Sequence, residues 1–188
     1  MGATLSAVLD RHPQTPTQVV RRIEARVHRE HSALLRLTFQ LDADLSRLRI
    51  PSASAPRFDY LLWQHTCFEA FIALPSGDAY HELNFAPSGE WAVYAFERYR
   101  EGAGVEDVAL APRITTRTAP TRLDLEAIVS LERLSPLYID APLRLGLSAV
   151  VEEDIGSLSY WSLHHRPGAA DFHHRDAFAL QLEPAARS

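Results

Sequence analysis

The side chains best suited to binding chemistry lie in residues 61–100, which read LLWQHTCFEAFIALPSGDAYHELNFAPSGEWAVYAFERYR. The first half of this segment alternates apolar residues with an aromatic ring, an imidazole and a carboxylate. Because successive side chains of a strand point to opposite faces, Trp63 and Glu69 fall on one face, and Phe68 and Ile72 on the other. The apolar face suits a protein core, so the mixed face is predicted to meet a ligand.

The next apolar run has the same two-sided character. Tyr80, Glu82 and Asn84 share one parity, and the apolar Leu83 and Phe85 share the other. If the two runs pair across the Pro-Ser-Gly-Asp turn between them, their mixed sides form one concave face. Such a face suits a sugar, because an aromatic ring covers the sugar's apolar side while carboxylate and amide groups bond its hydroxyls. The predicted ligand-binding residues of this face are Trp63, Glu69, Tyr80, Glu82 and Asn84. The alternative is that the aromatics are framework residues and the carboxylates are merely solvated.

Two catalytic uses of the same cleft remain open. Glu69 and Glu82 have the chemistry of the two-carboxylate arrangement of a glycosidase. Cys67 and His65 would share a strand face, and a cysteine–histidine pair can form a nucleophilic thiolate. The sequence contains no GxSxG, P-loop, HExxH or dinucleotide motif. We therefore expect binding rather than catalysis and assign no catalytic residue.

Nine histidines raise the question of a metal or a haem group. A zinc set of His165, Asp171 and His173 is conceivable, although the alternative that these histidines hydrogen-bond the backbone is stronger. Haem ligation by a methionine–histidine pair is disfavoured because Met1 is the only methionine, which leaves a bis-histidine site as the haem alternative. We expect neither a metal nor another cofactor.

Length and composition indicate one globular domain. The chain has 188 residues, of which 46% are apolar and 23% charged, so a single domain over residues 1–188 is expected. A formal net charge of −5 argues against a nucleic-acid partner, and no stretch approaches the ~20 apolar residues of a membrane helix. The start lacks a basic segment followed by an apolar one, and Cys67 is the single cysteine, so we expect a cytoplasmic protein.

Two-residue alternation dominates the rest of the sequence and indicates strands. Apolar residues recur at every second position in residues 23–27, 35–41, 123–129 and 143–151, and Phe178, Leu180 and Leu182 form a closing run of the same kind. Turns rich in proline and glycine separate the runs at intervals of roughly 8–15 residues, a spacing typical of a sandwich or barrel. We predict an all-β, antiparallel two-sheet β-sandwich of about ten strands, with one short helical turn in residues 131–137.

Five segments follow one another in the order LWQHTCFEAFIA, YHELNFAPSGEWAVYAF, LEAIVSLERLSP, LRLGLSAVVEEDIGSLSYWSL and DFHHRDAFALQL. This ordered set resembles the DOMON-like group of domains related to family 9 carbohydrate-binding modules. The resemblance covers residues 17–183. It implies a jelly-roll or immunoglobulin-like β-sandwich that acts as a non-catalytic module and binds a sugar or, in other branches of the group, haem.

The resemblance also implies particular site residues. In the sugar-binding modules, a tryptophan six residues before a glutamate helps to form the site, and Trp63 and Glu69 have this spacing. A second aromatic closes the site, and Trp161 is its candidate. An arginine of the sugar binders falls near His81 or Glu82, where this chain has none. A third possibility is an interaction domain whose cleft no longer takes a ligand.

Overall fold

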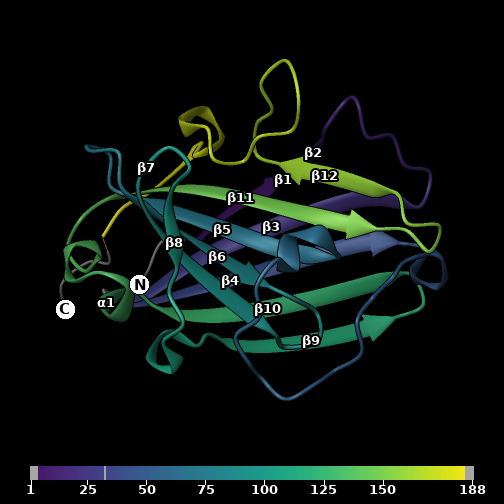
Figure 1. Ribbon diagram of the computed structural model, residues 1–188, viewed down its shortest axis with the longest axis horizontal. Helices are drawn as coiled ribbons and strands as arrows, with labels where there is room; N and C mark the ends of the chain where they lie inside the picture. The colour runs from purple at the N-terminus through teal and green to yellow at the C-terminus, as the bar shows by residue number, and fades with distance from the viewer. Residues whose placement is uncertain (1–3, 32, 185–188) are drawn as a thin grey trace.

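The computed structural model describes residues 4–31 and 33–184. These residues form thirteen strands in two antiparallel sheets that pack face to face (Figure 1). The predicted all-β sandwich is therefore confirmed. The strands outnumber the expected ten in part because β2 (Asp10–Arg11) and β8 (Glu101–Gly104) are too short to show alternation in the sequence, whereas β13 (Leu180–Leu182) lies in the predicted closing run.

The smaller sheet contains long strands that alternate regularly. In hydrogen-bonding order, its strands are β1 (Thr4–Val8), β3 (Val20–His31), β4 (Leu34–Ala43), β10 (Arg122–Ser130) and β9 (Arg113–Ala119). In β4 and β10 every second residue is buried, as the period of a strand requires. One face of this sheet is thus apolar and packs on the other sheet.

The larger sheet carries the predicted ligand-binding strands. In order, its strands are β2, β12 (Leu158–Ser162), β11 (Leu143–Glu152), β5 (Cys67–Ala73), β6 (Tyr80–Phe85), β7 (Trp91–Arg98) and β8, and β13 also pairs with β11. β5 and β6 pair as antiparallel neighbours, which confirms the expected hairpin. Their shared face is where the candidate site forms.

Helical structure is confined to short turns. The single α-helix of the described residues is α1 (Leu131–Leu134), which begins where a helical turn was predicted. The 3-10 turns are η1 (Leu45–Arg47), η2 (Leu62–Gln64), η3 (Val108–Leu110), η4 (Pro136–Tyr138) and η5 (Arg175–Ala177). No helix within the described residues has the length and apolar character needed to span a bilayer.

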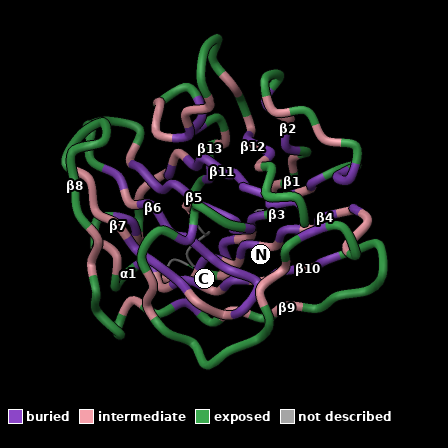
Figure 2. Tube along the Cα trace, turned by 45° about the vertical axis from the view of Figure 1, so that its right-hand side comes forward, coloured by how far each residue is buried: buried purple, intermediate pink, exposed green. Residues whose placement is uncertain are grey.

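The main core lies between the two sheets, and the buried residues gather in the central strands while the connecting loops are largely exposed (Figure 2). Phe39 of β4 and Phe68 of β5 meet there, with ring centroids 5.1 Å apart. Leu83 and Phe85 of β6 face the same core. The opposite parity of β5 and β6 therefore points away from the core, as the alternation predicts.

The larger sheet is also covered on this second face. Phe71 and Tyr80 pack there against Phe172 and Phe178 in a separate apolar cluster. The segment that follows β12, drawn in yellow tones, crosses beyond β11 on the side away from β9 and β10 (Figure 1). This cover converts part of the outer face into a pocket.

Candidate functional site

A pocket of about 660 Å³ opens on the outer face of the larger sheet. Its floor comes from β5 and β6, and its walls come from β7, β8, β11, β12 and the segment after β12. The aromatic side chains that line it, besides a histidine, are Trp63, Tyr94, Phe96, Tyr160 and Phe172. The charged or titratable groups Glu69, Glu82, Arg100 and His173 also line it. Its volume lies within the ~300–1,000 Å³ of sites for small molecules.

Two glutamates lie side by side on the floor of the pocket. Glu69 of β5 is paired with Asn84 of β6 in the strand register, and Glu82 is two residues before Asn84, so the two glutamates are diagonal neighbours on one face. Glu69 is 2% exposed and Glu82 is 5% exposed. The strand period places both carboxylates on the face opposite the core, where the pocket is the space available to them.

Glu69 is the more isolated of the two carboxylates. The hydroxyl of Ser148, on β11, donates to its Oε2 over 3.0 Å. Burial, and then the nearby charge of Glu82, raise the pKa of Glu69 to about 8, while the bond from Ser148 lowers it. Near neutral pH this side chain is therefore mainly a neutral carboxylic acid, able to donate as well as accept.

Glu82 has a fuller set of partners. Asn84 Nδ2 donates to its Oε1 over 2.8 Å, and His173 Nε2 lies 3.6 Å from its Oε2. Burial raises the pKa of Glu82 to about 7, and the amide of Asn84 and the charge of Arg100 act against this shift. Glu82 therefore changes its charge around neutral pH.

A hydrogen-bonded chain supports Glu82 from the side. The backbone N–H of Arg100 donates to the hydroxyl oxygen of Tyr80 over 3.1 Å, and this hydroxyl lies 2.9 Å from Nδ1 of His173. Burial lowers the pKa of His173 to about 4, so its imidazole is neutral at physiological pH. The chain is satisfied when Tyr80 donates to Nδ1 and Nε2–H of His173 faces Glu82.

Arg100 reaches the pocket from the turn between β7 and β8, where its φ of 56° is in the left-handed region. Its Nη2 donates to Asp171 Oδ1 over 3.0 Å, and its Nε donates to the hydroxyl of Tyr99 over 3.3 Å. Asp171 also accepts from Tyr99 over 2.8 Å. The guanidinium is thus held in an ion pair that ties the turn to the segment after β12.

Trp63 forms part of the rim of the pocket. Trp63 lies on η2, and Leu61, the residue before η2, has a left-handed backbone conformation with φ of 63°. Leu62 is buried against Cys67 and Ala92 and anchors the turn, whereas Trp63 is 43% exposed and lines the pocket. An aromatic ring that is both exposed and part of a pocket wall is available to stack on a ligand.

Glycines of β8 keep the neighbouring wall open. Gly102 pairs with Phe96 and Gly104 pairs with Tyr94 in the strand register. A Cβ on Gly102 would lie 2.1 Å from the carbonyl oxygen of Ala95, so only glycine fits there. Because β8 carries no side chain beside either ring, both rings face the pocket.

Comparisons with solved structures give the same fold. A protein from Bacteroides uniformis to which carbohydrate binding is assigned superimposes with a TM-score of 0.65 at 10% identity, over 92% of this chain and 83% of that one. A family 9 carbohydrate-binding module from Caldicellulosiruptor kristjanssonii, solved with glucose, has a TM-score of 0.55 at 11% identity over 92% and 80% of the two chains. With cellotriose bound, that module gives 0.52 at 11% identity, over 93% and 85%. The chain has the fold of these carbohydrate-binding modules. No protein-family model and no curated protein matches the sequence.

The structure brings together three of the six residues predicted to bind a ligand. Trp63, Glu69 and Glu82 line the pocket. Asn84 is fully buried behind it and acts as the donor to Glu82, and Tyr80 stands behind His173 and lines an adjoining pocket instead. These two residues hold the floor of the pocket rather than form its surface.

Trp161 was predicted to line the ligand site, and the structure places it elsewhere. Its ring is 6% exposed and packs in the core between the sheets, and its Nε1 donates to the hydroxyl of Ser159 over 3.0 Å. Its neighbour Tyr160 occupies the pocket wall instead. A shift of one residue along a strand exchanges the two faces, so the predicted second aromatic falls on the wrong side of β12.

Trp63 does not lie on a strand, contrary to the prediction. β5 begins at Cys67, and Trp63 lies before it on the 3-10 turn η2. His65 leaves the face of Cys67 and bonds Glu152, with Nδ1 and Oε2 2.8 Å apart. Cys67 is fully buried, does not line the pocket, and has a thiol pKa that burial raises well above its usual range. The structure therefore contradicts a nucleophilic Cys67–His65 pair.

The conceivable zinc set is not assembled either. His165 Nε2 bonds the carbonyl oxygen of Asp10 over 2.8 Å, Asp171 is paired with Arg100, and His173 is bonded to Tyr80. Within residues 4–31 and 33–184, no three histidine, cysteine, aspartate or glutamate side chains are grouped as metal ligands. Each proposed ligand has a different partner.

Several pocket residues were not predicted from the sequence. The parity that separates the rings of Tyr94 and Phe96 from Val93 is visible in the sequence. That parity could have identified them. Arg100 and Phe172 lie on a turn and in a loop, where no periodicity reports the direction of a side chain.

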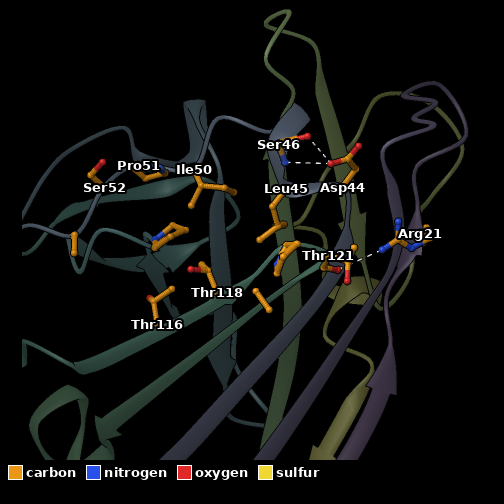
Figure 3. Close-up of a pocket in the computed structure, with 14 residues that line it drawn as sticks. Arg21, Asp44, Leu45, Ser46, Ile50, Pro51, Ser52, Thr116, Thr118 and Thr121 are labelled. Atoms are coloured by element: carbon orange, nitrogen blue, oxygen red, sulfur yellow. Dashed lines mark hydrogen bonds between the residues drawn. The ribbon is translucent and has the colours of Figure 1, made fainter.

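A second cavity, of about 820 Å³, lies at the edge of the smaller sheet (Figure 3). Thr116, Thr118 and short apolar side chains line it, and no aromatic ring is among them. Its charged groups hydrogen-bond the backbone. Arg21 donates to the carbonyl oxygen of Thr121 over 3.3 Å, and Asp44 caps η1 by accepting from the backbone N–H of Ser46. The pocket on the outer face of the larger sheet, called the aromatic pocket below, is therefore the stronger candidate site.

Proposed function

We propose that the protein is a non-catalytic module that binds a small carbohydrate in the aromatic pocket. The observation that carries this proposal is the combination, in one pocket, of the exposed ring of Trp63 with the buried carboxyl groups of Glu69 and Glu82. Rings complement the apolar face of a sugar and carboxyl groups complement its hydroxyls. The family 9 neighbours, whose structures contain glucose and cellotriose, support the proposal.

The proposal includes a relation to the DOMON-like group, but it favours the sugar-binding branch over haem binding. His173 is the only histidine among the described residues that line the pocket, and it is held by Tyr80. A bis-histidine haem site would need a second imidazole in the same space.

Titration calorimetry with glucose, cellotriose and related sugars tests the proposal. Trp63→Ala should weaken the binding of any sugar detected by about 5–30-fold, the equivalent of ~1–2 kcal/mol of stacking energy. Its urea unfolding should change little because Trp63 is exposed. Leu137→Ala, which shortens an exposed side chain on η4 outside the pocket, is the matched control. A large loss of stability with unchanged sugar affinity would make Trp63 a structural residue.

A hydrolytic use of the same pocket is the second candidate, and the raised pKa values of the two glutamates favour it. A glycosidase needs one protonated and one ionised carboxyl group, and pKa values of about 8 for Glu69 and about 7 for Glu82 allow this pairing near neutral pH. Release of nitrophenol from nitrophenyl glycosides, lost in Glu82→Gln, would establish the enzyme. Binding without turnover supports the module.

A further inference from the structure

The charges that line the aromatic pocket do not balance. Glu69 and Glu82 are both buried on its floor. Arg100 is the one guanidinium in the described lining, and it is already paired with Asp171. His173 is neutral because burial lowers its pKa. Ionising both floor carboxylates would therefore leave negative charge in the pocket that the described residues do not neutralise.

One oxygen of the Glu69 carboxyl group is open to the pocket. Ser148 donates to Oε2, whereas Oε1 has no hydrogen bond within the described residues and is not among their fully buried atoms that lack a partner, so it is reached from the pocket. At 2% exposure, this carboxyl group has little contact with water outside the pocket. Because Glu69 lines the pocket, a ligand entering it is in position to donate to Oε1 in place of solvent. An ammonium group supplies up to three donors and a positive charge at once.

The walls suit a cation as well. Tyr94, Phe96 and Tyr160 present aromatic rings to the same space. Aromatic faces attract cations, most strongly where water is excluded. A hydroxyl group could also donate to Oε1 of Glu69, but it would leave the charge of the floor unchanged.

We propose that the ligand is an amino sugar whose primary ammonium group lies against Glu69 and Glu82. This inference rests on the proposed carbohydrate-binding function and narrows it to a substrate class. The ammonium supplies the charge that the floor lacks, and the sugar ring contacts the aromatic walls.

Proton release distinguishes this mode from the binding of a neutral sugar. Near pH 7 the carboxyl pair holds a proton, since the pKa values are about 8 and about 7. A bound cation favours the ionised pair and expels that proton, whereas a neutral hydroxyl does not. The other titratable or charged groups around the pair are Cys67, Tyr80, Tyr94, Arg100, Asp171 and His173.

Calorimetry at pH 7 on protein treated with EDTA provides the test. Glucosamine, galactosamine and mannosamine are each compared with the parent sugar and with the N-acetyl derivative, which has no charge. We expect one amino sugar to bind at least about tenfold more tightly than both of its neutral counterparts. Titrations in two buffers of different ionisation enthalpy should report proton release for that amino sugar and none for its parent.

Matched variants assign the effect to the floor of the pocket. Glu69→Gln and Glu82→Gln should each reduce the preference for the amino sugar to about twofold or less while the parent sugar still binds. Glu106→Gln, which removes an exposed carboxylate from the loop after β8, should retain the full preference.

The outcomes separate the two proposals. Equal affinity for an amino sugar and its parent would overturn the ammonium inference and leave carbohydrate binding intact. Binding of cyclohexylamine as tight as that of the best amino sugar would support ammonium recognition and overturn a sugar ligand. Absence of binding by every sugar, charged or neutral, would overturn the proposed function itself.

Discussion

Replacing Glu69 by glutamine should make the folded protein more stable above neutral pH and weaken its ligand binding. Glutamine has nearly the same shape and can still accept from Ser148, but it cannot ionise. Burial and the charge of Glu82 raise the pKa of Glu69 from 4.5 to about 8. The unfolded chain therefore ionises Glu69 at a lower pH than the folded protein does, and the stability of the native protein falls as the pH rises between these two values.

The magnitude follows from the two pKa values. At pH 4 both states hold the proton, and Glu69 contributes almost nothing to the pH dependence. At pH 8 the unfolded state has lost the proton, which costs the folded protein roughly 4 kcal/mol relative to pH 4. The stability advantage of Glu69→Gln over the wild type should thus grow by about 2–4 kcal/mol between pH 4 and pH 8. Each kcal/mol corresponds to roughly 2–4 °C in Tm. His173 titrates in both proteins, so its effect largely cancels in the difference.

Urea unfolding of the wild type and Glu69→Gln at pH 4, 6 and 8 measures this growth, with Glu106→Gln as the control. A stability difference between the two proteins that stays constant from pH 4 to pH 8 would refute the reasoning. Glu69 would then have the same ionisation in the folded and unfolded states. Higher stability combined with lost ligand affinity is the expected signature of a carboxylate retained for binding.

Three further predictions concern residues behind the pocket. Trp161→Ala should lower the free energy of unfolding in urea by ~3–5 kcal/mol, because its ring is buried. It should change sugar affinity less than about twofold. Lost sugar affinity with intact stability would contradict the place of Trp161 in the core. Asn84→Ala removes the donor to Glu82 and should cost ~1–3 kcal/mol at pH 8. The cost should be smaller at pH 5, where Glu82 is protonated, and equal unfolding curves of wild type and variant at pH 8 would count against this bond. The buried thiol of Cys67 should react with a disulfide reagent only as fast as the protein opens, and immediate reaction would disprove its burial.

The sequence alone determined the sandwich and the two faces of its central strands. A strand has a period of two residues, so the identities of neighbouring residues decide which side chains share a face. The same local rule separated Glu69 and Glu82 from Phe68 and Leu83, and the structure confirms both assignments. No long-range information was needed for this step.

Only the tertiary structure decided which groups meet in the pocket. Ser148, the hydrogen-bond partner of Glu69, is 79 residues away along the chain, and the pairing of β5 with β11 brings the two together. The choice of Tyr160 over Trp161 depended on the register of β12, and His173 reached the pocket because the segment after β12 folds back over the sheet. Long-range register and loop paths are set by the packing of the whole chain, and local alternation carries no record of them.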